Sequence, residues 1–158
     1  MRSIALSPAQ HDAVSILLAC LDDAGVWYRA TGGLAGNIHG SRWPLHDIDL
    51  DVRKDEWDRV LAAMSDFVET SPRPYEDHEF RLILANARIE GVHVDIAQLE
   101  DAYVRQDGEW VALSADPGRR VLRDWSDFSI WAIPLDDLIA YKSRIGRTAD
   151  VAELHRLR

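Results

Sequence analysis

The chain has 158 residues, of which 47% are hydrophobic and 28% charged, a composition typical of a globular chain and not of a disordered one. Its formal net charge of −9 argues against broad, non-specific binding to nucleic acid, which depends on phosphate neutralisation by Lys and Arg. Its apolar runs are too short to span a bilayer, its single cysteine excludes an internal disulfide, and residues 1–12 lack the apolar core of a signal peptide, so we expect a cytoplasmic protein.

The first predicted elements are a helix and a short strand. Ser7 as N-cap and Pro8 at the first helical position predict a helix that ends at Gly25. Residues 26–31 are rich in β-forming side chains and predict a strand. A glycine-rich stretch, residues 32–40, follows it and favours a sharp turn into a helix start.

The middle of the chain predicts strands around one further helix. Residues 47–52, DIDLDV, predict a strand with its aliphatic side chains in the core and its three aspartates on the opposite face. An amphipathic helix is expected from about Asp55. Residues 71–79, SPRPYEDHE, predict a loop because two prolines disfavour regular pairing. Residues 80–89 and 92–99 then predict two strands joined around Glu90-Gly91.

The remaining residues predict a hairpin, a strand and two helices. Asp107-Gly108 favours a turn within residues 103–113, and residues 128–133 predict a strand. Helices are expected after Pro134 and from Thr148. This mixed order predicts an α+β fold with a mixed β-sheet flanked by helices, as one domain over residues 1–158, and not a doubly wound parallel sheet.

Two carboxylates on the predicted strand suggest chemistry with a divalent cation. Asp47 and Asp49 are two residues apart and therefore point the same way, so they repel each other unless a cation lies between them. Mg²⁺ prefers such oxygen ligands and often completes its shell with water and substrate phosphates. Asp95 shares this chemistry on a later strand, and if the two strands are neighbours the three acids would lie close enough for two ions.

The alternative is an exposed strand whose acidic face is simply solvated. The residues before the strand favour a site, because Gly32-Gly33 follows a strand and can present backbone N–H groups to phosphate. Ser41 and Arg42 add a hydroxyl and a guanidinium shortly before the carboxylates.

These residues resemble a known superfamily. The double glycine, Arg42, His46 and the Asp47-Ile48-Asp49 strand are similar to the pattern of the DNA polymerase β-like nucleotidyltransferases, and most similar to the small aminoglycoside and lincosamide nucleotidyltransferases. The resemblance covers about residues 10–100, and residues 135–158 are similar to the helical tail of such proteins. Asn37 stands where the antibiotic enzymes often have an acidic residue, which leaves the acceptor open.

The resemblance implies a role for each residue. Asp47 and Asp49 would hold Mg²⁺ against the triphosphate of an NTP, with two ions expected, and Asp95 would complete the metal site or take the proton of the acceptor hydroxyl. Gly32, Gly33, Ser41 and Arg42 would bind the phosphates, and Lys142 and Arg147 would offset their charge.

The implied activity is the transfer of a nucleoside monophosphate to a hydroxyl acceptor, such as an antibiotic-like small molecule. Three alternatives remain: a toxin–antitoxin type enzyme that modifies tRNA or protein, a non-catalytic nucleotide-binding module, and a plain acidic domain. A homodimer that completes the acceptor cleft is a further expectation from the resemblance.

Overall fold

The computed structural model describes residues 5–113 and 118–158. Residues 1–4, the start of the segment without a signal-peptide core, and residues 114–117 lie outside the described part. None of the helices in that part is both long and apolar enough to span a membrane. The helical segments are α1 (Pro8–Asp23), α2 (Gly32–Ile38), the 3₁₀ turn η1 (Lys54–Glu56), α3 (Trp57–Ala63), α4 (Leu135–Arg144) and α5 (Thr148–His155).

The described strands form one mixed sheet in the order β7-β6-β4-β5-β2-β1-β9-β8, and β3 also pairs with β4. The β2–β5 and β1–β9 pairs are parallel and the other pairs are antiparallel, which confirms the predicted mixed sheet. The strands are β1 (Tyr28–Ala30), β2 (Ile48–Val52), β3 (Val68–Glu76), β4 (Phe80–Ile89), β5 (Val92–Gln98), β6 (Tyr103–Gln106), β7 (Glu109–Ala112), β8 (Val121–Trp125) and β9 (Phe128–Ala132).

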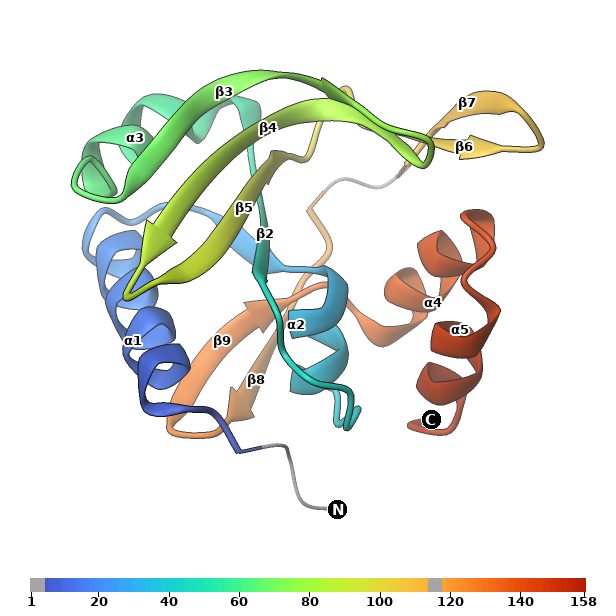
Figure 1. Cartoon of the computed structure of the whole chain (residues 1–158), viewed down its shortest axis with the longest axis horizontal. Helices are drawn as coiled ribbons and strands as arrows, with labels where there is room; N and C mark the ends of the chain where they lie inside the picture. The colour runs from blue at the N-terminus through green and yellow to red at the C-terminus, as the bar shows by residue number, and fades with distance from the viewer. Residues whose placement is uncertain (1–4, 114–117) are drawn as a thin grey trace.

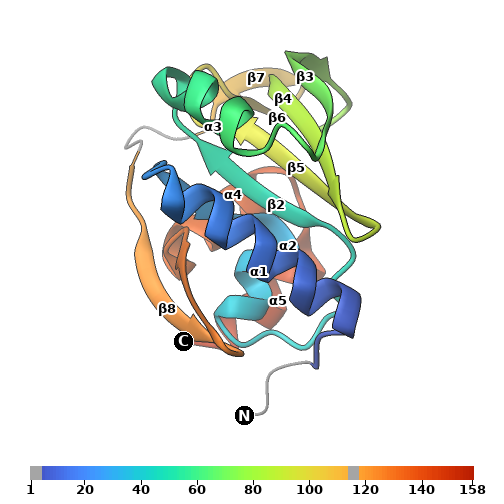
Figure 2. The same cartoon turned by 90° about the vertical axis from the view of Figure 1, so that its left-hand side faces the viewer.

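Helix α1 covers one face of the sheet (Figure 2). The helix begins as predicted: the Ser7 hydroxyl accepts a hydrogen bond from the Gln10 backbone N–H, and the Ser7 backbone N–H donates to the Gln10 side-chain oxygen. Its apolar stripe joins the main buried cluster with Ile48, Leu50 and Val52 of β2. The odd-numbered aspartates of β2 therefore lie on the opposite face, because side chains alternate along a strand.

Helices α2, α4 and α5 lie together away from α1 (Figure 1). Ala35 of α2 packs in a second buried cluster with Ile139 of α4 and Leu154 of α5. Helices α4 and α5 are the expected C-terminal helices, and together with α2 they stand beside the face of the sheet that carries the aspartates.

The prediction of a loop at residues 71–79 is wrong, because most of the segment belongs to β3. Among the described strands β3 pairs only with β4, so Pro72 and Pro74 lie on an edge where a missing N–H donor is tolerated. The register of β3 shifts twice along β4, after Val68 and after Thr70. These bulges accommodate the segment that the prolines would exclude from a central strand.

Other boundaries differ from the predictions by small amounts. The predicted strand at 26–31 is shortened to three residues, and the helix expected near Asp55 starts with a 3₁₀ turn. Strand β8 was not predicted. The Glu90-Gly91 and Asp107-Gly108 turns are confirmed, and all four residues have the positive φ angles that tight hairpins require.

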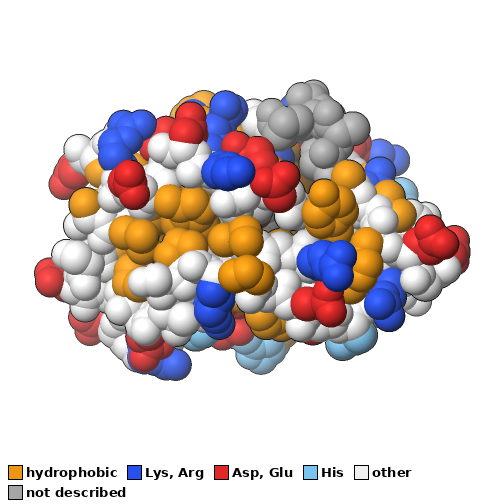
Figure 3. All heavy atoms as spheres, turned by 90° about the horizontal axis from the view of Figure 1, so that it is seen from above, with side chains coloured by type: hydrophobic (Ala, Val, Ile, Leu, Met, Phe, Trp, Pro, Cys, Tyr) orange, Lys and Arg blue, Asp and Glu red, His pale blue; other side chains and the backbone are white. Residues whose placement is uncertain are grey.

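Hydrophobic side chains gather on the outer face that includes β3 (Figure 3). A groove there is lined by Trp57, Pro72, Pro74 and Ile83, together with charged side chains such as Arg81. This groove and the cavity that contains the aspartates are two hollows that share Tyr75 and Leu82 in their walls.

Candidate active site

The structure places Asp49 and Asp95 side by side. Strands β2 and β5 are parallel neighbours, and Asp49 is in register with Asp95. Both carboxylates line a cavity of 530 Å³ between the sheet and α4. The sequence analysis expected a shared site only if the strands that carry these two aspartates were neighbours. The structure shows that they are neighbours.

The electrostatics of Asp49 reflect this crowding. Burial, followed by the charges of Asp95 and Asp47, raises the pKa of Asp49 to about 7 from an ordinary value of 3.8. Lys142 opposes the shift but does not cancel it. A cation that enters the cavity would therefore stabilise the ionised form of this carboxylate.

Asp47 lies at the edge of this arrangement. It precedes the first residue of β2, is exposed, and is not among the described residues that line the cavity. Within residues 5–113 and 118–158, no three His, Cys, Asp or Glu side chains are gathered closely enough to form a complete metal site. The protein thus offers two adjacent carboxylates, Asp49 and Asp95, with a third nearby.

The first residue of the double glycine, Gly32, lies directly against Asp49. Gly32 has φ +57°, and a Cβ at this position would be 2.6 Å from Asp49 Oδ2. The Thr31 N–H donates to the Asp49 carbonyl oxygen at 3.0 Å, and the Gly32 N–H donates to the Tyr141 hydroxyl at 3.1 Å. Gly32 and Gly33 both line the cavity. Only a residue without a side chain fits this close approach.

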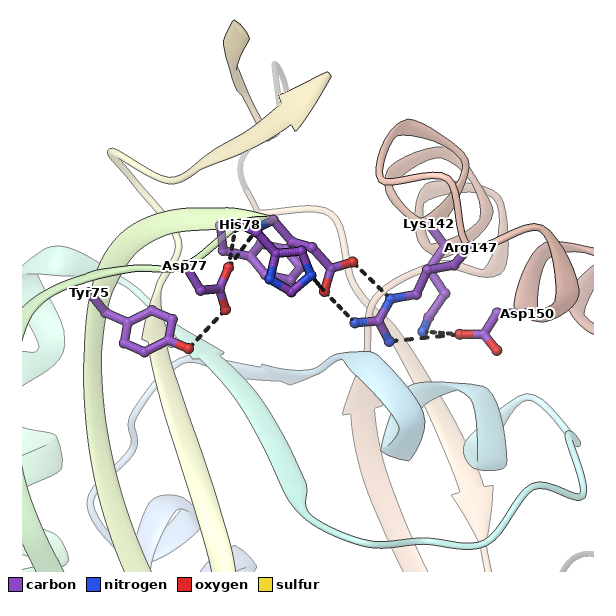
Figure 4. Close-up of polar contacts among 8 residues, drawn as sticks. Tyr75, Asp77, His78, Lys142, Arg147 and Asp150 are labelled. Atoms are coloured by element: carbon purple, nitrogen blue, oxygen red, sulfur yellow. Dashed lines mark hydrogen bonds and ion pairs between the residues drawn. The ribbon is translucent and has the colours of Figure 1, made fainter. Parts of the chain in front are cut away.

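Lys142 reaches the same cavity from α4. Its side chain is buried, and Nζ donates to Asp150 Oδ2 at 2.9 Å (Figure 4). Arg147 also lines the cavity, and its guanidinium donates to both carboxylate oxygens of Glu79, at 2.7 and 3.1 Å. The C-terminal helices are thus tied to the turn between β3 and β4 across the cavity.

Ser41 and Arg42 are placed elsewhere. The Ser41 side chain is fully buried and accepts a hydrogen bond from Asn37 Nδ2 at 3.1 Å, whereas Arg42 is exposed. Neither is among the described residues that line the cavity. Trp43 packs its ring against Gly36 and donates from Nε1 to the Gly33 carbonyl at 3.0 Å, so it supports the double-glycine helix from behind.

Asp51 differs from the expected solvated acid. It is buried and accepts a hydrogen bond at 2.9 Å from Arg29 Nε, and Arg29 is itself 3% exposed. Burial raises the pKa of Asp51, and the Arg29 charge opposes the rise. Arg29 and Asp51 are in register on β1 and β2, so the pair could have been anticipated only from strand pairing.

Around Asp95, sequence reasoning missed Asn86, whereas the position of His93 two residues before Asp95 already suggested that its side chain could orient this carboxylate. Asn86 Nδ2 donates to Asp95 Oδ1 at 2.6 Å, and His93 Nε2 lies 2.7 Å from the same oxygen. Tyr75 and Asp77, from the segment predicted as a loop, line the cavity and are joined by a 2.8 Å hydrogen bond (Figure 4). No pattern in the sequence pointed to Tyr141. Burial, followed by the Asp49 charge, raises the pKa of its hydroxyl.

Known structures share this fold. No family model matches the sequence, and no curated protein matches it. A Thermotoga maritima protein assigned as a nucleotidyltransferase superposes with a TM-score of 0.74 at 19% identity, over 96% of this chain and 94% of its own. The chain therefore has a nucleotidyltransferase-like fold, as the sequence resemblance suggested.

Two antibiotic-modifying enzymes are similar in the same way. ANT(2″)-Ia, in complex with adenylyl-2″-tobramycin, has a TM-score of 0.57 at 17% identity, over 91% of this chain and 84% of its own. The lincosamide antibiotic adenylyltransferase LnuA, bound to lincomycin, has a TM-score of 0.60 at 15% identity, over 92% of this chain and 96% of its own. At these identities the likeness establishes the fold.

Proposed function

We propose that the protein is a Mg²⁺-dependent nucleotidyltransferase that moves a nucleoside monophosphate from an NTP to a hydroxyl acceptor and releases pyrophosphate. One observation carries the proposal: Asp49 and Asp95 lie in register in a cavity, with the Gly32 backbone pressed against Asp49. The shared fold supports it.

The donor set fits a hard divalent cation. Carboxylate oxygens are the ligands that Mg²⁺ prefers, and this ion is commonly bound by one or two carboxylates with phosphates and water in the other positions. Asp49 and Asp95, in register on β2 and β5, would be the principal ligands, and Asp47 and the second expected ion stay expectations from the sequence resemblance. The bound metal would neutralise phosphate charge and polarise the reacting phosphoryl group.

The chain's own groups would bind the triphosphate. Gly32 and Gly33 lie at the cavity wall beside Asp49, and Lys142 brings a positive charge to the same space. Because Ser41 and Arg42 do not line the cavity, we assign the phosphate contacts to the two glycines and Lys142. The Lys142 charge and the backbone N–H dipoles of the double glycine would act where negative charge accumulates during transfer.

The acceptor side of the cavity contains acidic and apolar groups. Asp77 and Glu79 line it together with Leu82 and Leu84. We propose a small acceptor with a hydroxyl group, an apolar body and a positive charge, in keeping with the chain's net charge of −9. Asp95 would accept the proton of that hydroxyl directly or through one water, if it is not fully engaged by metal.

The test is transfer of label from each of the four α-labelled NTPs to candidate small acceptors, purified tRNA and a protein extract. Replacing Asp49 or Asp95 by Asn should lower transfer at least about a hundredfold. Asp55→Asn, which removes an exposed carboxylate outside the cavity, is the matched control and should retain activity.

The outcomes separate the alternatives. Label on tRNA or protein alone would favour the toxin–antitoxin type of enzyme. Mg²⁺-dependent NTP binding without transfer to any acceptor would favour a nucleotide-binding module. Full activity of Asp49→Asn would refute the assigned site.

A further inference from the structure

Arg73 occupies an unusual position between two prolines on the edge strand β3. From Thr70 to Arg73 the strand advances three residues, while its partner β4 advances two, from Asn86 to Leu84. The extra residue is a bulge, and bulges redirect the side chains beside them. The Arg73 side chain is half-buried, and its Nη1 donates to the Leu84 carbonyl oxygen at 3.0 Å.

Arg73 fixes the orientation of the Asn86 amide. Its Nη2 donates to Asn86 Oδ1 at 2.8 Å. A guanidinium carries donors and no acceptor, so the oxygen of the amide must face Arg73 and the NH₂ group must face away from it. The two possible orientations of this amide are therefore not equivalent, and Arg73 selects one.

The selected orientation directs the amide donor at Asp95. Asn86 is directly opposite Asp95 in the β4–β5 register, and its Nδ2 lies 2.6 Å from Asp95 Oδ1. His93 Nε2 contacts the same oxygen at 2.7 Å. Asp49, Asp95 and Asn86 thus form one row across three neighbouring strands, and two contacts hold one oxygen of the middle residue.

We infer that Arg73 and Asn86 are positioning residues: through the chain Arg73–Asn86–Asp95 they fix the Asp95 carboxylate relative to Asp49. This inference rests on the proposed function, in which the Asp95 carboxylate binds the metal ion or accepts the proton of the acceptor hydroxyl. It also accounts for the Pro-Arg-Pro segment, whose rigid backbone holds Arg73 at the bulge. Groups that orient ligating carboxylates commonly contribute 10–100-fold to metal affinity or activity.

The hydrogen bonds can be tested without activity. In a ¹⁵N-labelled sample, the Asn86 side-chain NH₂ signals are assigned by their loss in Asn86→Ala. We expect them to be widely separated in the wild type, and to move toward free-amide positions in Asp95→Asn and in Arg73→Met. Signals at free-amide positions in the wild type would overturn the inference.

The effect on Asp95 is tested with Mn²⁺ as the probe. Electron paramagnetic resonance titration should show a Kd for Mn²⁺ raised about tenfold or more in Asn86→Ala and in Arg73→Met. Arg81→Met is the matched control, since it removes a guanidinium that pairs with Glu76 on the same two strands, outside the cavity. Unchanged Mn²⁺ affinity in both variants would overturn the inference.

Kinetics distinguish positioning from general stabilisation. With labelled NTP, kcat should fall about tenfold or more in each variant while KM for NTP changes less than threefold. Because Arg73 acts through Asn86, the double variant should be no slower than Asn86→Ala alone, whereas two independent defects would multiply. Defects that multiply in the double variant would overturn the inference.

A different result would refute the proposed function and leave the inference in place. This result is a wild-type protein that shows the separated Asn86 amide signals and binds Mn²⁺ but transfers no label.

Discussion

At the scale of single residues, the backbone at Gly32 and the Asp49 side chain are in direct contact. The Thr31 N–H binds the Asp49 carbonyl oxygen, and the left-handed Gly32 lies against the Asp49 side chain. The Tyr141 hydroxyl accepts the Gly32 N–H from the other side. The proposed phosphate-binding turn and the proposed metal ligand therefore cannot shift independently, so substitutions at either residue should affect both.

Replacing Gly32 by Ala should be destabilising. The φ of +57° disfavours any side chain, and a Cβ 2.6 Å from Asp49 Oδ2 would force the carboxylate to move. We expect a loss of about 1–3 kcal/mol in the free energy of unfolding, measured by urea denaturation, and a loss of label transfer. Gly33→Ala, whose Cβ would meet only an ordinary contact 3.8 Å from Trp43, should be as stable as the wild type. Equal stability of the two variants would contradict this explanation.

The raised pKa of Asp49 predicts a pH-dependent stability without divalent ions. With a folded-state pKa of about 7 and an ordinary value of 3.8, the folded protein holds the proton more tightly, so stability falls as pH rises between these values. Asn at this position removes the penalty. In EDTA, Asp49→Asn should match the wild type near pH 4 and exceed it above pH 7, by up to about 4 kcal/mol. A difference that is constant with pH would contradict the assignment, and Asp55→Asn should follow the wild type.

At the scale of secondary-structure elements, a buried ion pair joins β1 to β2. Arg29 and Asp51 face each other across this antiparallel pair, and both are buried side chains at the wall of the cavity that Asp49 also lines. Arg29 also donates to the Arg119 carbonyl at 2.9 Å and so ties the segment before β8 to the centre of the sheet. The ion pair therefore joins parts of the chain that are far apart in sequence.

Breaking this pair on one side should be costly. Asp51→Asn leaves a buried guanidinium without its counter-charge, and we expect a loss of about 3–5 kcal/mol in the free energy of unfolding. Replacing both partners, with Arg29→Met and Asp51→Leu together, should cost less than Asp51→Asn alone. Chemical denaturation of the two proteins measures both effects. A double variant less stable than the single one would show that the charges themselves stabilise the sheet.

Sequence reasoning succeeded for elements whose signal is local. The alternation in residues 47–52 and the Glu90-Gly91 turn determine β2 and the β4–β5 hairpin without reference to distant residues. It failed for β3, because prolines disfavour a strand unless it lies on an edge with bulges, and edge position is a property of the whole sheet. Arg73 was lost from the candidate site for the same reason.

At the scale of the whole molecule, the cavity is formed by segments that are far apart in the sequence. The sheet supplies Asp49 and Asp95, and the C-terminal helices supply Lys142 and Arg147. The second buried cluster joins α2 to these helices, so the double-glycine turn and Lys142 are held by the same packing. A ligand that contacts both sides should therefore stabilise the molecule as a whole.

Binding of an NTP with Mg²⁺ should raise the melting temperature. At a ligand concentration about 100 times Kd, the gain is about 2.7 kcal/mol, which for a protein of this size corresponds to roughly 5–10 °C. EDTA should abolish the shift, and so should Asp49→Asn, measured against its own unliganded melting temperature. An equally large increase in melting temperature in EDTA would show that the nucleotide binds without a metal ion held by the carboxylates.

Sequence reasoning selected two of the acids that line the cavity, but it did not select Asp77 or Glu79, which line the same cavity. Asp49 and Asp95 were selected by their alternation and lie in register, but Ser41, selected by its spacing from them, is buried against Asn37. Spacing along the chain cannot tell whether a short side chain faces a cavity or the core. Contacts such as Asn86 with Asp95 depend on strand order, which no local pattern contains.

The proline pair on β3 also influences how these molecules behave when crowded together. An uncovered strand edge invites a strand from another molecule, and repeated addition of this kind produces fibrils. Pro72 and Pro74 offer no N–H, and two bulges interrupt the spacing that an incoming strand would need. This border of the sheet therefore resists polymerisation, although hydrophobic side chains lie exposed close to it.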